Sequence, residues 1–186
     1  PMELSSLGAI NRHMSAKKCV LSAVISIRNE ETQHEDCLST LNFADEIVVL
    51  LDDCTDGSRD IATQFTNRVI NGDWQLEGDR RNAAIDACCG DWIFEIDADE
   101  RVPGPLGAEI RRVAESSSYD WHGIPVDNYI GNRLVRYGWG GSWGKSQYPG
   151  LFRKSVKRWG RQRLHPALDL RGREGPTLTH RLNHYV

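Results

Sequence analysis

The stretch GDWIFEIDADER, from Gly90 to Arg101, joins a short apolar run directly to an acidic cluster. The run from Trp92 to Ile96 is typical of a strand that is buried on both faces of a parallel sheet. If the extended chain continued through Ala98, Asp97 and Asp99 would point to the same side, at the end of the strand where open α/β sheets bind ligands. Two such carboxylates can hold a hard divalent cation, the usual partner of a diphosphate. The alternative is an acidic turn without a ligand.

Apolar runs and helical patterns alternate along the first two thirds of the chain. We expect strands at 20–27, 46–51, 68–70 and 92–96, and helices at 34–41, 59–65, 77–89 and 103–116. This order predicts a Rossmann-like, mostly parallel sheet flanked by helices. After Tyr119 the pattern predicts mixed strands and loops. There Trp139, Trp143 and Tyr148 either offer a platform for a sugar ring or lie over the core, and the glycines around them suggest a loop that closes over a substrate.

Length and composition favour one globular domain. The chain has 186 residues, 39% of them hydrophobic and 26% charged, and no apolar run approaches the roughly 20 residues that span a bilayer. Residues 1–14 lack the apolar segment of a signal peptide and are interpreted as an extension, with residues 15–186 as the domain. The five cysteines include no CxxC pair or metal-ligand spacing. They are interpreted as small buried residues of a reducing compartment, the cytosol.

The net charge of −3 conceals a strong asymmetry along the chain. Up to Asn132 there are 11 basic and 24 acidic residues, whereas beyond it there are 12 basic and 2 acidic ones. A basic segment of this kind attracts phosphate-rich ligands or an anionic membrane surface. A solvated basic face that balances the acidic part is the alternative. The densest basic cluster consists of Arg153, Lys154, Lys157, Arg158, Arg161 and Arg163.

Five segments together resemble the inverting family 2 glycosyltransferases with the GT-A fold. They are ISIRNEE at 25–31, FADEIVVLLDDCTDGS at 43–58, RRNAAIDACCGDWIFEIDADER at 80–101, LFRK at 151–154 and the terminal NHYV. Within that family, the chain is most similar to lipopolysaccharide-core glycosyltransferases. The resemblance implies a nucleotide-sugar-binding half at 18–118 and an acceptor-side half at 119–186. Resembling enzymes commonly continue past the HY motif, and the sequence leaves open whether this chain continues past Val186.

The resemblance also implies a site. It places Arg28, Asn29 and Glu30 along the nucleotide cleft, Asp52 against the base or ribose, Arg81 near the nucleotide, and Asp97 at the ribose or donor sugar. It implies that Asp99 binds Mg2+ or Mn2+ at the diphosphate, with His184 as a further ligand. The implied partners are a nucleotide-diphosphate sugar donor and a saccharide or lipid-linked saccharide acceptor. A cytoplasmic location, with peripheral contact to the inner face of the membrane, is expected, and no nucleic acid partner.

The catalytic base is not assigned by the resemblance. An inverting transfer needs a carboxylate to take the proton from the acceptor hydroxyl. Resembling enzymes carry an acid just before the LFR segment or after a histidine near position 165, where this chain has SQYPG and HPA. His165, Asp127 and Asp169 are therefore the candidates. The family's acidic pair before the DGS turn is also incomplete, because Leu51 occupies what looks like its first position.

Two other functions remain open at the level of sequence. A sugar-phosphate nucleotidyltransferase also uses an α/β fold and an aspartate-bound metal, but RNEE is not the glycine-rich phosphate loop expected after its first strand. A catalytically silent nucleotide-sugar-binding module would explain the missing acid. Slow metal-dependent release of nucleoside diphosphate from the donor would distinguish the enzyme from the silent module.

Overall fold

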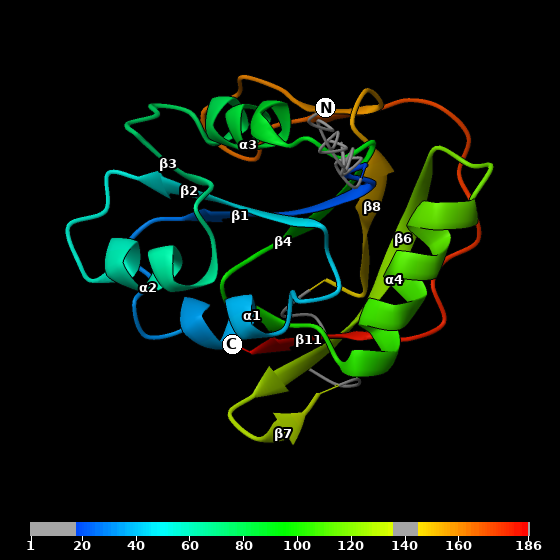
Figure 1. Cartoon of the computed structure of the whole chain (residues 1–186), viewed down its shortest axis with the longest axis horizontal. Coiled ribbons are helices and arrows are strands. Elements are labelled where there is room, and N and C mark those ends of the chain that lie inside the picture. The colour runs from blue at the N-terminus through cyan, green and yellow to red at the C-terminus, as the bar shows by residue number, and fades with distance from the viewer. Residues whose placement is uncertain (1–17, 136–144, 186) are drawn as a thin grey trace, which may run out of the picture.

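The computed structural model of the protein describes residues 18–135 and 145–185. Figure 1 shows helices packed on both sides of a central sheet. The helices are α1 (His34–Ser39), α2 (Ser58–Phe65), α3 (Glu77–Ala87) and α4 (Gly104–Ser116). The strands are β1 (Leu21–Ile27), β2 (Glu46–Asp52), β3 (Val69–Gly72), β4 (Trp92–Ile96), β5 (Glu100–Arg101), β6 (Trp121–Ile130), β7 (Arg133–Leu134), β8 (Gln147–Arg153), β9 (Lys157–Trp159), β10 (Leu168–Leu170) and β11 (Leu182–Tyr185).

One large sheet connects the two halves of the sequence. Its strand order within the described residues is β3-β2-β1-β4-β8-β6-β11-β5, with β7 paired to β6, while β9 and β10 form a separate ribbon. Strands β3, β2, β1 and β4 are mutually parallel, whereas β8 runs antiparallel to both of its neighbours. The predicted fold, a mostly parallel Rossmann-like sheet followed by mixed strands, is therefore confirmed.

The two faces of the parallel strands are covered by different helices. Alternate side chains of a strand point to opposite faces, so Ile25 packs in the cluster that includes residues of α1, α2 and α4, while Val24 packs in the cluster formed with α3. Figure 1 shows α3 on one side of β1 and β2 and the pair α1 and α2 on the other. Burial on both faces explains why these strands read as nearly continuous apolar runs.

The chain does not stay extended after β4, contrary to the expectation for Ala98. The strand ends at Ile96, and the amide of Glu100 donates to the carbonyl of Asp97 at 3.1 Å, which closes a turn over Ala98 and Asp99. The chain then re-enters the sheet as β5, which pairs with β11. This turn is compatible with the acidic composition, because aspartate favours turns.

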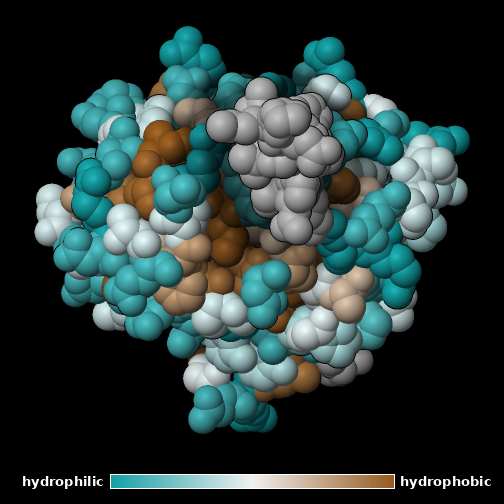
Figure 2. All heavy atoms as spheres, viewed as in Figure 1, coloured by the Kyte–Doolittle hydropathy of each residue, from teal (hydrophilic) through white to brown (hydrophobic). Residues whose placement is uncertain are grey.

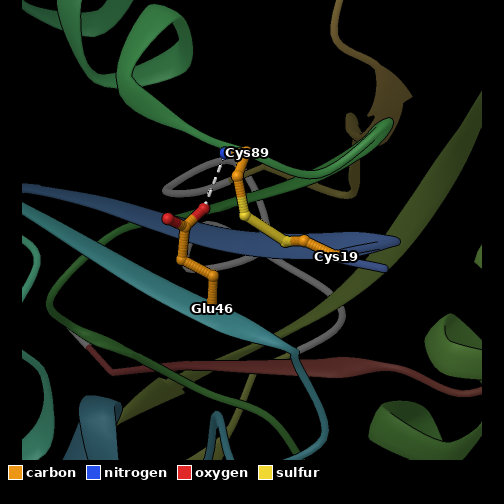
Figure 3. Close-up of side chains that lie close together, drawn as sticks. All are labelled: Cys19, Glu46 and Cys89. Atoms are coloured by element: carbon orange, nitrogen blue, oxygen red, sulfur yellow. Dashed lines mark hydrogen bonds between the residues drawn. A yellow bond between two sulfur atoms is a disulfide. The ribbon is translucent and has the colours of Figure 1, made fainter. Parts of the chain in front are cut away.

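The interpretation of all five cysteines as free thiols is wrong for two of them. Cys19, which directly precedes Val20, and Cys89, the second residue after α3, form a disulfide, as Figure 3 shows. Their α-carbons lie 6.1 Å apart, although 70 positions separate them in sequence. Cys37 and Cys88 are buried thiols, as expected. Disulfides are typical of oxidising compartments, so the cytosolic location stays a prediction that this pair does not support.

The surface in Figure 2 is mostly hydrophilic, and apolar side chains emerge between polar ones near the centre of the face. Among the described helices, none combines the length and the apolar character required to cross a membrane. Of the three predicted platform aromatics, Trp139 and Trp143 lie outside the described residues, as does most of the predicted closing loop. Tyr148 packs against the core, and its hydroxyl donates to the carbonyl of Glu95 at 2.9 Å.

Candidate active site

A polar cleft of about 260 Å3 lies at the carboxyl ends of β1 and β4. It is lined by Ser26, Arg28, Glu30, Arg80, Arg81, Asp97, Ala98 and Asp99. Five of the predicted site residues therefore share one cavity, although they come from segments up to 71 positions apart. Cations and carboxylates both line it, which suits a ligand that carries phosphate and hydroxyl groups.

The loops that follow β1 and β2 are joined beside this cleft. Asn29 has a φ of 56°, in the left-handed region that a non-glycine residue rarely adopts. Its side-chain oxygen accepts from the amide of Thr55 at 2.8 Å, and Glu31 accepts from the amide of Gly57 at 2.7 Å. Asn29, predicted to line the cleft, is thus not one of its lining residues but holds the two loops together. Strained backbone of this kind is common at ligand-binding sites.

Asp52 is buried behind the cleft at the end of β2. One carboxylate oxygen accepts from the amide of Trp74 at 3.0 Å, and the other accepts from Arg80 at 3.0 Å and lies 3.9 Å from Arg28. Buried charges are stable only when they are paired and hydrogen-bonded. Asp52 therefore fixes Arg80 and attracts the more exposed Arg28, both of which line the cleft, and the pairing of Arg80 was not foreseen from the sequence.

Arg81 projects from α3 toward the acidic turn and has three carboxylate partners. Its guanidinium donates to Glu77 at 2.9 Å, to Glu95 at 3.0 Å and to Asp97 at 3.2 Å. Burial alone would lower the pKa of Arg81, but Asp97 and Glu95 outweigh burial and raise the pKa above its usual range. The side chain is thus a fixed positive charge beside the predicted donor position.

Lys145 lies between two carboxylates of the acidic turn. Its ammonium is 3.1 Å from Asp97 and 2.8 Å from Glu100. Burial tends to raise the pKa of Asp97, but Lys145 and Arg81 outweigh burial and hold that pKa below its usual range. Burial and the neighbouring charge of Asp97 raise the pKa of Glu100. Sequence reasoning assigned no role to Lys145, because nothing in the glycine-rich stretch before it marks it as a partner of the turn.

Asp99 and His184 lie together, as the resemblance implied. The ring nitrogen Nε2 of His184 is 3.1 Å from Asp99 Oδ2, and Nδ1 is 2.8 Å from the side-chain oxygen of Asn128. The hydrogen bond with Asp99 raises the pKa of His184. The second oxygen of Asp99, Oδ1, is buried and has no hydrogen-bond partner among the described residues. Both ring nitrogens therefore face acceptor oxygens, and Nε2 would have to lose its proton before it could bind a metal. Histidines that bind metals commonly use one nitrogen as the ligand while the other donates to a neighbour, so the pair could hold a divalent cation that displaces this proton.

The three candidate bases lie outside the residues that line the cleft. Asp127 is buried on β6 and accepts from Arg181 at 2.6 Å. Because strand side chains alternate, Asp127 faces away from Asn128, whose side chain points to His184. His165 is exposed in the connection between β9 and β10, and Asp169 on β10 pairs with Arg171 at 2.8 Å. Their catalytic roles stay predictions, and the geometry described here does not favour any of them.

Glu95 is a further buried acid that the sequence analysis did not single out. It lies inside β4 and accepts from Lys157 at 2.6 Å and from the indole of Trp159 at 3.2 Å, in addition to Arg81. A single charged residue within an otherwise apolar strand was the available signal, because acids are almost never fully buried without a partner. The network connects Arg81 to β9, beyond the cleft.

A larger hollow of about 760 Å3 lies at the opposite edge of the sheet, beside the disulfide. A carboxylate oxygen of Glu46 and the two sulfur atoms lie within 4.8 Å of one another. Figure 3 shows these three side chains together. The sulfurs are joined, however, and Glu46 accepts from the amide of Cys89 at 2.8 Å and pairs with Arg68 at 3.0 Å. These groups satisfy one another, so the cleft at the carboxyl edge is the better candidate site.

The sequence pattern of the family described as "Glycosyl transferase family 2" matches residues 22–165, which include every lining residue of the cleft. The chain belongs to glycosyltransferase family 2. It is 29% identical over 112 residues to "Uncharacterized glycosyltransferase RC0292" of Rickettsia conorii, covering 60% of this chain and 39% of that protein. It is 27% identical over 124 residues to "Lipopolysaccharide core biosynthesis glycosyltransferase LpsC" of Rhizobium meliloti, covering 64% of this chain and 43% of that protein.

Solved structures agree at the level of the fold. S. aureus TarS (residues 1–349) in complex with UDP-GlcNAc superposes with a TM-score of 0.65 at 13% identity, over 90% of this chain and 58% of that chain. The predicted GT-A fold of this family 2 member is thereby confirmed. The chain spans about two fifths of the length of the curated relatives named above.

Proposed function

We propose that the cleft binds a nucleoside-diphosphate sugar and that the domain transfers the sugar to a saccharide or lipid-linked saccharide acceptor. The observation that carries this proposal is the set of three arginines, Arg28, Arg80 and Arg81, that lines one cavity together with Asp97 and Asp99 at the carboxyl edge of a family 2 domain. TarS, which shares the fold, was crystallised with UDP-GlcNAc. A uridine nucleotide is therefore the first donor to test.

The charged residues of the cleft would divide the donor between them. Guanidinium groups bind phosphate oxygens through paired hydrogen bonds; Arg80 is held by Asp52, and Arg28 lies near the same carboxylate with a mostly exposed side chain. Asp97, kept ionised by its cationic neighbours, would accept hydrogen bonds from sugar hydroxyls. The three arginines would also stabilise the negative charge that develops on the departing diphosphate.

A divalent cation, Mg2+ or Mn2+, is part of this proposal. Asp99 offers a buried oxygen without a hydrogen-bond partner among the described residues, and His184 offers Nε2, with its ring oriented by Asn128. Carboxylates suit both ions, and an imidazole suits Mn2+. When bound, such an ion supplies positive charge that offsets the charge of the leaving diphosphate.

The proposed acceptor and the proposed contact with a membrane rest on a relative and on the basic cluster. The relative LpsC is named for lipopolysaccharide core biosynthesis, and we propose a related glycan acceptor. The basic cluster is a weaker argument than the sequence suggested, because Lys157 is buried against Glu95 while Arg158 pairs with Asp86 at 2.7 Å and Arg161 with Asp79 at 3.2 Å. Contact with an anionic membrane surface stays a prediction.

The test is calorimetric titration of UDP and UDP-GlcNAc in Mn2+ and in a chelator, on the wild-type chain and on Asp99→Asn. The substitution keeps the shape of the side chain but removes its charge, so we expect the Mn2+-dependent part of the affinity to fall at least tenfold. Asp91→Asn is the matched control, because Asp91 is an acid paired with Lys18 at 2.7 Å, outside the lining of the cleft. Equal affinity of wild-type and Asp99→Asn proteins for UDP in Mn2+ would contradict the metal role.

Donor turnover separates the enzyme from a silent binding module. An active domain should release UDP slowly from UDP-GlcNAc in Mn2+, with water as the acceptor, and the release should stop in the chelator. Tight binding without any release would favour the binding module. An absence of binding to any nucleoside diphosphate would contradict the proposed function as a whole.

A further inference from the structure

Lys145 is held within the acidic turn from several directions. Its ammonium contacts Asp97 and Glu100, and it lies 4.2 Å from the ring centre of Tyr148. The backbone carbonyl of Lys145 accepts from the side chain of Asn128 at 3.2 Å. Only 29% of the Lys145 side chain is exposed, so the cation is an internal part of the cluster rather than a surface charge.

The turn needs a cation at this position when the cleft contains no ligand. Asp97, Asp99 and Glu100 lie within four residues of one another, and Glu100 is fully buried. One oxygen of Glu100 accepts from the amide of Asp97 at 2.9 Å, and the other faces Lys145. A buried carboxylate without a partner is strongly destabilising. Arg81 neutralises the Asp97 side of the cluster, so Lys145 is the partner that neutralises Glu100.

A divalent ion at Asp99 would approach the same group of charges. Asp97 is shared, since it contacts Lys145 and lines the cleft beside Asp99. Two cations at so short a distance repel each other. The long, flexible stem of a lysine allows its ammonium to move away by several ångströms. The diphosphate of a donor bound in the cleft would bring new negative charge beside Asp97, which Lys145 contacts.

We propose that Lys145 is an internal counter-cation: it neutralises Asp97 and Glu100 while the cleft is empty and moves to the donor's diphosphate when a divalent ion binds at Asp99. This inference rests on the proposed function. It assigns Lys145 two opposite effects. It opposes metal binding in the absence of donor, and it strengthens donor binding once the metal is present.

The test compares Lys145→Met with the wild-type chain in two titrations. Binding of Mn2+ alone is followed by the loss of the free-ion signal in electron paramagnetic resonance, and UDP binding in saturating Mn2+ is followed by calorimetry. We expect Lys145→Met to bind Mn2+ about tenfold more tightly, because the repulsion between a divalent and a monovalent cation about 5 Å apart is worth about one decade even at the dielectric constant of water. We expect its UDP affinity to fall about tenfold, the usual effect of losing a charged hydrogen bond.

Three further variants make the result decisive. Lys145→Arg keeps the charge and should retain wild-type Mn2+ affinity. Lys18→Met removes an exposed lysine that pairs with Asp91 and should change neither titration. If Lys145→Met unfolds because Glu100 loses its partner, Lys145→Met combined with Glu100→Gln removes the unpaired charge, and the same increase in Mn2+ affinity relative to Glu100→Gln alone is expected.

The outcomes separate this inference from the proposed function. One outcome is that the wild-type chain binds Mn2+ and UDP while Lys145→Met binds Mn2+ no more tightly than the wild type. That result would overturn the counter-cation role and leave the proposed function intact. Tighter Mn2+ binding with undiminished UDP affinity would overturn the movement to the diphosphate. A wild-type chain that binds neither Mn2+ nor UDP would overturn both.

Discussion

Glu95→Ala should be among the most destabilising single substitutions in this protein. Glu95 is 6% exposed and Lys157 is 1% exposed, and their charged atoms are 2.6 Å apart. Burial lowers the pKa of Lys157, and the charge of Glu95 opposes that effect. Without the carboxylate, the hydrogen bond that remains to the buried ammonium among the described residues is the one to the carbonyl of Pro149 at 3.0 Å, beside the rings of Phe152 and Trp159. Breaking a buried pair from one side costs about 3–5 kcal/mol of unfolding free energy, and we expect a loss in that range.

The measurement is urea unfolding at pH 7, with Glu77→Ala as the control. Glu77 binds the same Arg81 at 2.9 Å, but its side chain is 40% exposed and the pair spans one helical turn. Exposed pairs of this kind contribute about 0.3–0.5 kcal/mol. Both variants remove a carboxylate from Arg81, but Glu95→Ala also removes the carboxylate partner of the buried Lys157, so the contrast measures the cost of breaking the buried pair.

A double substitution tests whether the unpaired charge of Lys157 causes the loss of unfolding free energy. Replacing both partners, Glu95→Leu with Lys157→Met, removes the two buried charges together and should be less destabilising than the sum of the single substitutions. A Glu95→Ala loss below about 1 kcal/mol, or strictly additive effects in the double variant, would refute the reasoning.

Two further predictions concern the edges of the fold. Cys89→Ser should lower the unfolding free energy by about 2–4 kcal/mol, because the disulfide closes a long loop. A reductant should destabilise the wild type but not this variant, and Cys54→Ser, which removes a free thiol, is the control. Wild-type stability that does not depend on the reductant would contradict this prediction. Glu109 accepts from the amides of Thr179 and His180, each at 2.9 Å. Burial tends to raise the pKa of Glu109, but these hydrogen bonds lower it below the ordinary value of 4.5. Its ionised form therefore stabilises the fold above that pH, and the effect is lost as pH falls through the lowered pKa. Glu109→Gln should be less stable by about 1–2 kcal/mol at pH 7 and approach wild-type stability as the pH falls below the lowered pKa; a difference in stability that does not narrow in acid would contradict this.

The parallel half of the fold could be predicted because its signals are local. The run from Trp92 to Ile96 is buried along its whole length and reads as a strand without any knowledge of its neighbours. The start of α4 likewise follows from Pro103, whereas α3 ends at Ala87, two residues before its predicted end. The sequence left open whether the chain turns at Asp97, because the same acidic residues are compatible with an extended end or with a turn.

The missed features depend on partners that are distant in the sequence. Lys145 meets Asp97 across 48 positions, and Lys157 meets Glu95 across 62. The disulfide joins residues separated by 70 positions, without a spacing motif. Local patterns carry no information on such pairs. The contact between His184 and Asp99, across 85 positions, was anticipated only because the resemblance to a family implied it.

The distribution of charge explains why the site can stay folded without a ligand. The carboxylates of the acidic turn come from one short segment, whereas the cationic and histidine partners come from three separate elements: Arg81 from α3, Lys145 from the entry to β8 and His184 from β11. The charge of the turn is therefore neutralised only when all three elements are packed around it. A donor and a metal ion would meet a site whose charges are already paired, so binding requires exchange of partners rather than the neutralisation of free charges. Such exchange makes affinity depend on how readily each internal partner can leave. Lys145, with its flexible stem, can leave more easily than Arg81, which is held by three carboxylates.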